Sequence, residues 1–196
     1  MTGGGGNTAL GKSTMSAVVT GSNNTAVGYT ALSANTTASN NVAVGHNSLV
    51  ANTTGATNTA VGMGSLQANT TASDNVGIGH SALEANTTGA GHTSIGKNTL
   101  KAVTTANFLT AVGSGAGASN TTGGELVAVG RNALTANTTG DSNTAVGMRA
   151  LDANTTASNN TAVGADALGA NTTGSENTAV GQNAGDAITT GSTNTC

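Results

Sequence analysis

The sequence predicts an all-β fold, a parallel β-solenoid, and three observations support this prediction. One glycine recurs at a constant interval, once in every seventeen positions, and apolar residues recur at fixed positions between these glycines. Gly, Asn, Thr and β-branched residues dominate the chain, and these residues are poor helix formers. A strict period of this kind is typical of stacked repeats. The recurring glycines, predicted to form tight corners, are Gly11, Gly28, Gly45, Gly62, Gly79, Gly96, Gly113, Gly130, Gly147, Gly164 and Gly181.

The unit is well represented by residues 24–40, NTAVGYTALSANTTASN. Thr25 and Val27 flank an alanine, so they share one face of a strand, and we expect that face to point inward. Leu32 follows four residues after the corner glycine and forms a second apolar column. The predicted core is Val27, Leu32, Val44, Leu49, Val61, Leu66, Ile78, Leu83, Ile95, Leu100, Val129, Leu134, Val146, Leu151, Val163 and Leu168.

The remaining residues of each unit are small residues that allow close packing and polar residues that are typical of turns. Ala31 and Ala34 are small enough for close approach, and residues 35–40 carry the Asn, Thr and Ser of a turn. We therefore expect two short strands and two turns per coil. A further column, with Asn24 and Asn58 among its members, is expected to stack into a hydrogen-bonded ladder.

Three segments follow from the period. Residues 1–6 form a Gly-rich leader that we expect to be flexible, residues 7–193 hold eleven units, and residues 194–196 begin a twelfth unit that is cut short. At about 4.8 Å per coil, the rod is roughly 50 Å long. One coil offers a thin core for the number of residues that it must order, which favours association with further copies of the chain.

Composition argues against several functions. Charged residues make up 7% of the chain, and five Lys and Arg cannot neutralise a run of phosphates, so nucleic-acid binding is not expected. No apolar run is long enough for a membrane span, and the N-terminus has no secretory signal pattern. The single cysteine, Cys196, excludes a disulfide within one chain.

We expect no catalysis, cofactor or metal. His46 and His80 occupy the same column two units apart, about 10 Å along the stack, and the histidines are predicted to lie in exposed turns. Residues 113–117, GSGAG, resemble a phosphate-binding loop but lack the lysine and the following helix.

Two features are candidates for recognition. The residues after the corner glycines vary from unit to unit and would supply specificity: Tyr29, His46, Met63, His80, Lys97, Arg131, Met148 and Gln182. In one region the repeat decays, with His92, Leu109 and Leu126 in a column that usually holds Asn, and with Phe108 beside it. These four residues are a candidate apolar patch for a partner, and the alternative is drift in a tolerant rod.

Thr-Thr pairs such as Thr36-Thr37 recur in register. A regular threonine array is also what ice-binding solenoids present, so ice binding is an alternative function. A passive spacer rod is a second alternative.

The units resemble those of two families of surface fibres. Residues 40–51, NNVAVGHNSLVA, resemble the NSVAIG-type head repeats of trimeric autotransporter adhesins, although those use a shorter unit. Residues 143–159, NTAVGMRALDANTTASN, look like the NTAVG repeats of bacteriophage tail fibres. The resemblance implies a left-handed β-roll, three chains side by side, Val42 and Val44 facing inward, and Gly45 as the motif glycine. It also implies an extracellular role, in a virion fibre or on a bacterial surface, in attachment to a receptor or glycan.

Overall fold

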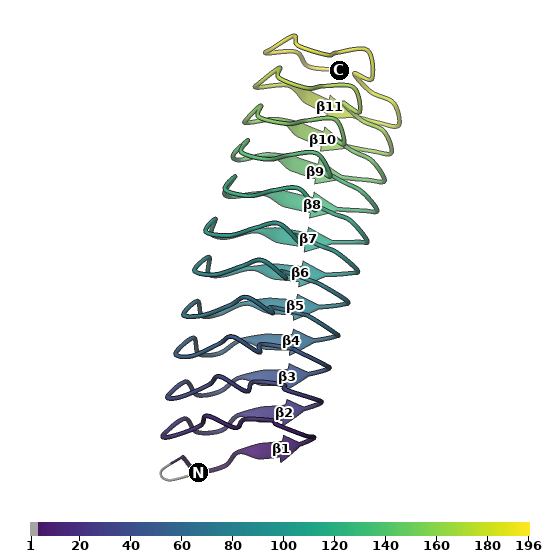
Figure 1. Cartoon of the computed structure of the whole chain (residues 1–196). Helices are drawn as coiled ribbons and strands as arrows, with labels where there is room; N and C mark the ends of the chain where they lie inside the picture. Colours follow the sequence, from purple (N-terminus) through teal and green to yellow (C-terminus); the bar gives the residue numbers. More distant parts are fainter. Residues whose placement is uncertain (1–3) are drawn as a thin grey trace.

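The computed structural model describes residues 4–196, and Met1–Gly3 of the predicted leader lie outside the described residues. Eleven strands of three residues form one parallel sheet in chain order (Figure 1). The strands are β1 (Thr8–Leu10), β2 (Thr25–Val27), β3 (Val42–Val44), β4 (Thr59–Val61), β5 (Val76–Ile78), β6 (Thr93–Ile95), β7 (Thr110–Val112), β8 (Val127–Val129), β9 (Thr144–Val146), β10 (Thr161–Val163) and β11 (Thr178–Val180). The prediction of a β-solenoid is confirmed.

The register follows directly from the period. Thr25 pairs with Val42 and Val27 with Val44, so every strand residue pairs with its equivalent in the next unit. Each sequence unit therefore forms one coil. Equivalent side chains of successive coils stack in rows along the rod, which we call files. Residues 4–196 contain no helix.

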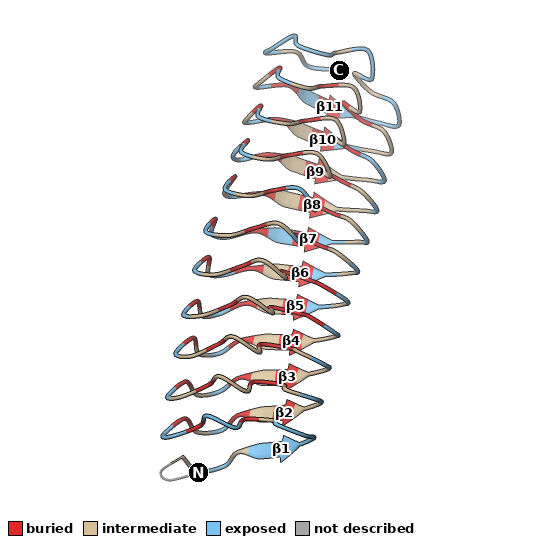
Figure 2. Cartoon of the chain, in the orientation of Figure 1, coloured by how far each residue is buried: buried red, intermediate tan, exposed pale blue. Residues whose placement is uncertain are grey.

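From β2 to β11, each strand buries its middle residue and turns its two flanking residues outward. Ala26 is fully buried, whereas Thr25 and Val27 are half-buried on the outer face (Figure 2). The pair does share a face, but the prediction that this face points inward is wrong. The correction applies to Val42 in the adhesin-like motif and to the predicted core residues Val27, Val44, Val61, Ile78, Ile95, Val129, Val146 and Val163.

The narrow interior explains which face is buried. A Cβ added at Gly77, the middle of β5, would stand 2.7 Å from Ser65 Oγ and 3.3 Å from Leu66 Cγ. The opposite wall of the coil is that close, so the middle column accepts only Ala, Gly or Ser. Two β-branched side chains per strand do not fit there, and they face outward instead.

The leucines supply the large side chains of the core. Leu32 is fully buried, and its equivalents in the predicted core are at most 1% exposed. They are Leu49, Leu66, Leu83, Leu100, Leu134, Leu151 and Leu168.

These leucines do not lie on a second strand, so that prediction is wrong. The segment after the corner is a run of tight turns, in which Ala31 N–H bonds Gly28 O and Asn35 N–H bonds Leu32 O. Thr30 and Leu32 have left-handed φ angles of 56° and 51°. Such a backbone costs about 1–2 kcal/mol for a non-glycine residue, and burying a leucine returns about 1.5–3 kcal/mol.

Two conditions exclude a side chain at the corner glycines: a positive φ at all of them and, except at Gly181, a close approach of the next coil. Their φ angles lie between 131° and 142°. At Gly62 an added Cβ would stand 2.5 Å from the Gly79 carbonyl oxygen in the next coil. Only glycine fits where two coils approach this closely.

Two files of asparagines, all buried except Asn7 and Asn194 at the ends, run along the rod. In the first Asn file (Asn7, Asn24, Asn41, Asn58, Asn75, Asn143, Asn160, Asn177 and Asn194), the Asn41 backbone N–H donates to Asn24 Oδ1 at 2.9 Å, and this pattern repeats. In the second Asn file (Asn35, Asn52, Asn69, Asn86, Asn120, Asn137, Asn154 and Asn171), Asn69 Nδ2 donates to Asn52 Oδ1 at 2.9 Å. The predicted ladder is therefore present in the first Asn file, and the second Asn file forms another ladder that was not predicted.

The stack continues past the eleven strands in the described residues. Gly5 of the predicted flexible leader donates its N–H to Ser22 Oγ at 3.3 Å and accepts the Asn23 N–H at 2.9 Å. Near the other end, Thr195 pairs in parallel with Thr178. Residues 194–196 thus lie on the stack like the start of a further coil.

Candidate interaction surfaces

The outer face of the sheet is uncharged and consists mostly of Thr, Val and Ile side chains. It consists of the two flanking residues of every strand, and none of the eleven strands contains a charged residue. Ile78, Ile95, Val112 and Val163 are each 36–38% exposed. We call this surface the sheet face. A continuous exposed stripe of this kind is a candidate interaction surface.

The residue after each corner glycine forms a second stripe, the corner file. Tyr29 and Met63 are 50% and 49% exposed, and the rings of Tyr29 and His46 lie 5.5 Å apart. Lys97 and Arg131 are also exposed. The variable residues singled out from the sequence therefore stack in one file on the outside of the rod.

A hollow of about 380 Å³ opens beside the corner file where Gly64 replaces a larger side chain. His46, Met63 and His80 border it on one side, and Glu84, paired with Lys101 at 3.5 Å, borders it on the other. Within residues 4–196, no three His, Cys, Asp or Glu side chains are placed to hold a metal ion.

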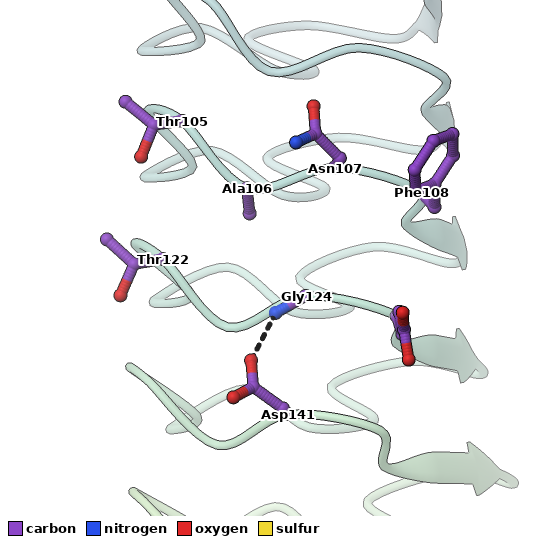
Figure 3. A pocket seen from close by; sticks show the side chains of 8 residues that line it. Thr105, Ala106, Asn107, Phe108, Thr122, Gly124 and Asp141 are labelled. Carbon is purple, nitrogen blue, oxygen red and sulfur yellow. Dashed lines mark hydrogen bonds between the residues drawn. The ribbon is translucent and has the colours of Figure 1, made fainter.

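A second hollow, of about 340 Å³, lies next to Phe108 (Figure 3). Gly124, which lacks a side chain, lines it, and the Gly124 N–H donates to Asp141 Oδ1 at 2.7 Å. Asn107 and Glu125 also line it. Phe108 is 70% exposed and has a left-handed φ of 58°, an unfavourable backbone for a bulky residue.

The predicted apolar patch is not a surface patch. His92, Leu109 and Leu126 are at most 2% exposed, and only Phe108 is on the outside. The reason is their column, because the first Asn file lies inside the coil. The prediction that His92 lies in an exposed turn is wrong for the same reason, whereas His80 is exposed.

The Thr-Thr pairs form one outer and one inner file. Thr37 and its equivalents are exposed. Thr36 is half-buried, and its Oγ1 donates to the Thr53 carbonyl of the next coil at 3.1 Å. The inner hydroxyls thus hold coils together, and only the outer file faces solvent.

Residues 4–196 include no helix long and apolar enough to cross a bilayer. Cys196 is a free, exposed thiol. Comparisons of the chain with models of known protein families, with curated proteins and with solved structures gave no match.

Proposed function

We propose that this chain is the shaft or head of a surface fibre, assembled from three copies. The observation that carries the proposal is the sheet face, which runs the length of the described stack without a charge. A second copy has the same rise per coil, so each contact repeats at every coil. Uncharged β-branched side chains need no compensating charge across such an interface.

The resemblance to adhesin heads and tail fibres supports the same assembly, as three left-handed β-rolls side by side. The corner file and the Phe108 hollow remain outside the sheet face and present varied side chains. They would contact a cell-surface receptor or glycan. The setting is extracellular, in a virion fibre or on a bacterial surface, and the role is mechanical and adhesive, with no catalytic chemistry.

The assembly is tested by placing a charge in the sheet face. Val44→Asp leaves the interior of the coil untouched because Val44 points outward. In an assembled fibre it buries an unpaired carboxylate in every copy, which is strongly unfavourable. We expect light scattering to show loss of the trimer, with the circular dichroism spectrum unchanged.

Thr37→Asp is the matched control, because Thr37 is exposed and lies away from the strands. It should leave the trimer intact. If the Val44→Asp variant still assembled to the same mass as the unmodified protein, the sheet face would not be the interface.

Attachment is tested at Phe108. Asn tolerates a left-handed backbone better than Phe, and Asn40 and Asn159 occupy the same column. Phe108→Asn should therefore leave the stability unchanged or raise it by about 0.5–1 kcal/mol. The same variant should lower the binding of the labelled fibre to an array of cell-surface glycans. Unchanged binding would favour a passive spacer at this position.

The outer Thr file favours a second candidate function, ice binding. Thr37 and its equivalents are exposed in every coil and share one spacing along the rod. Thermal hysteresis of the purified chain tests this candidate, and its absence would remove it.

A further inference from the structure

His92 takes the place of an asparagine in the first Asn file and reproduces the file's hydrogen bonds to both neighbouring coils. Its backbone N–H donates to Asn75 Oδ1 at 3.0 Å, as in the other coils. Its Nδ1 accepts the Leu109 N–H at 3.2 Å, which is the role of an asparagine Oδ1. The imidazole thus joins the coil of β6 to the coil of β7.

This contact requires a neutral imidazole with its proton on Nε2, because Nδ1 must offer a lone pair. Protonation places a hydrogen on Nδ1, the second on the ring, and this hydrogen points at the Leu109 N–H. Two donors then face each other inside the coil. A cation would also be buried there, since His92 is 1% exposed.

No charged group around His92 compensates for that charge; the Ala106 carbonyl only partly offsets the effect of burial. Its Nε2 lies near the Ala106 carbonyl without a well-formed hydrogen bond, and Asn86 Oδ1 beside it also has no partner. A Cβ at Gly89 would stand 2.7 Å from each of these two atoms, so they border the same small space. Asn75 and Leu109, which are hydrogen-bonded to His92 from the neighbouring coils, carry no charge.

The same coils lack hydrogen bonds that hold the rest of the rod together. Leu109 and Leu126 follow His92 in the first Asn file and offer no acceptor to the next coil. Val103 replaces the asparagine of the second Asn file, which leaves Asn86 Oδ1 unpaired. Backbone pairing of β6, β7 and β8 continues, so the stack remains closed while His92 is neutral.

We propose that the coils of β6 to β8 form an acid-sensitive seam, in which protonation of the buried His92 opens the rod locally. The histidine is the only bridge of its file between these coils, and it functions only when uncharged. The rest of the stack, joined by Asn side chains that do not titrate, stays closed at the same pH.

The direction of the pH dependence follows from the burial of His92. Desolvation lowers the pKa of His92 from 6.5 to about 4, and no charged group contributes to this shift. The nearest carboxylate along the chain from Asn75 is Asp74, which is exposed and hydrogen-bonded to Thr57. When the seam opens, His92 regains its ordinary pKa of 6.5 and binds a proton. The seam is therefore closed above pH 6.5, and its closure is lost as the pH falls toward 4.

Hydrogen exchange measured by mass spectrometry at pH 7 and pH 5, corrected for the intrinsic exchange rate, tests the seam. With these pKa values the opening equilibrium between β6 and β8 should rise about twenty-fold at pH 5. Peptides from β2 to β4 should keep their protection. In the same protein, an NMR titration should give His92 a pKa far below 6.5 in the folded state.

His92→Asn restores the asparagine ladder and should abolish the pH dependence, whereas His80→Asn, at an exposed corner, should leave it in place. The inference is overturned if His92 titrates near 6.5 in the folded chain, or if protection at β6 to β8 is equal at both pH values. It is also overturned if His92→Asn opens as readily at pH 5 as the unmodified chain. The titration needs no variant, so it decides the matter even if a substitution prevents folding.

Discussion

Replacing Gly62 by alanine is expected to destabilise the rod by about 3 kcal/mol or more, because two costs add at this residue. Its φ of 131° lies in a region that is nearly exclusive to glycine, at a cost of about 1–3 kcal/mol for another residue. The new Cβ would also stand 2.5 Å from the Gly79 carbonyl, and relieving such a clash costs about 1–3 kcal/mol. Urea unfolding followed by circular dichroism measures the change.

Gly124→Ala is the matched control. A Cβ at Gly124 meets no atom closer than 3.8 Å, and its φ lies outside the left-handed region. This variant should unfold within about 0.5 kcal/mol of the unmodified chain. Equal losses for the two variants would mean that the backbone and the close approach at the corner glycines do not exclude a side chain.

Replacing Leu83 by alanine is expected to cost about 2–5 kcal/mol. Leu83 is fully buried and is the large aliphatic side chain at the centre of its coil. The neighbouring coils are held at a fixed rise by strand pairing, so they cannot close over the cavity. The same urea titration measures the effect, and hydrogen exchange should show the loss concentrated around β5 and β6, because each coil contacts only its neighbours.

Val50→Ala serves as the comparison. Val50 is half-buried and lies outside the strands, so its loss should cost less than about 1 kcal/mol. If Val50→Ala were as damaging as Leu83→Ala, the leucine file would not be the core of the rod.

The coil could be predicted from the sequence because the length of the repeat sets the register of the sheet. Each strand residue pairs with the residue one repeat later. The interval from Gly28 to Gly45 becomes one turn of the solenoid, and a fixed column becomes a file. Burial of Leu32 and stacking of Asn24 on Asn41 follow from that alone.

It was harder to predict which face of the strand is buried. Alternation shows that Thr25 and Val27 share a face but does not say which face is inside. The missed signal was the column between them, which never holds a side chain larger than Ser and therefore marks the tightest part of the interior. Gly77 shows this constraint most directly, since an added Cβ would stand 2.7 Å from Ser65 Oγ.

The position of His92 was missed for a related reason. An asparagine column between turn residues looks solvent-exposed when it is considered one unit at a time. Only the stack shows that the Asn75 backbone N–H donates to Asn58 Oδ1 inside the coil, so that a histidine in this column is buried as well.

The central claim is that the sheet face joins three chains, and sedimentation equilibrium of the unmodified protein tests it most directly. One chain has a mass of 18.5 kDa. The proposed fibre predicts a single species with three times the mass of one chain, and this species should persist on dilution. A stable species with the mass of one chain would contradict it.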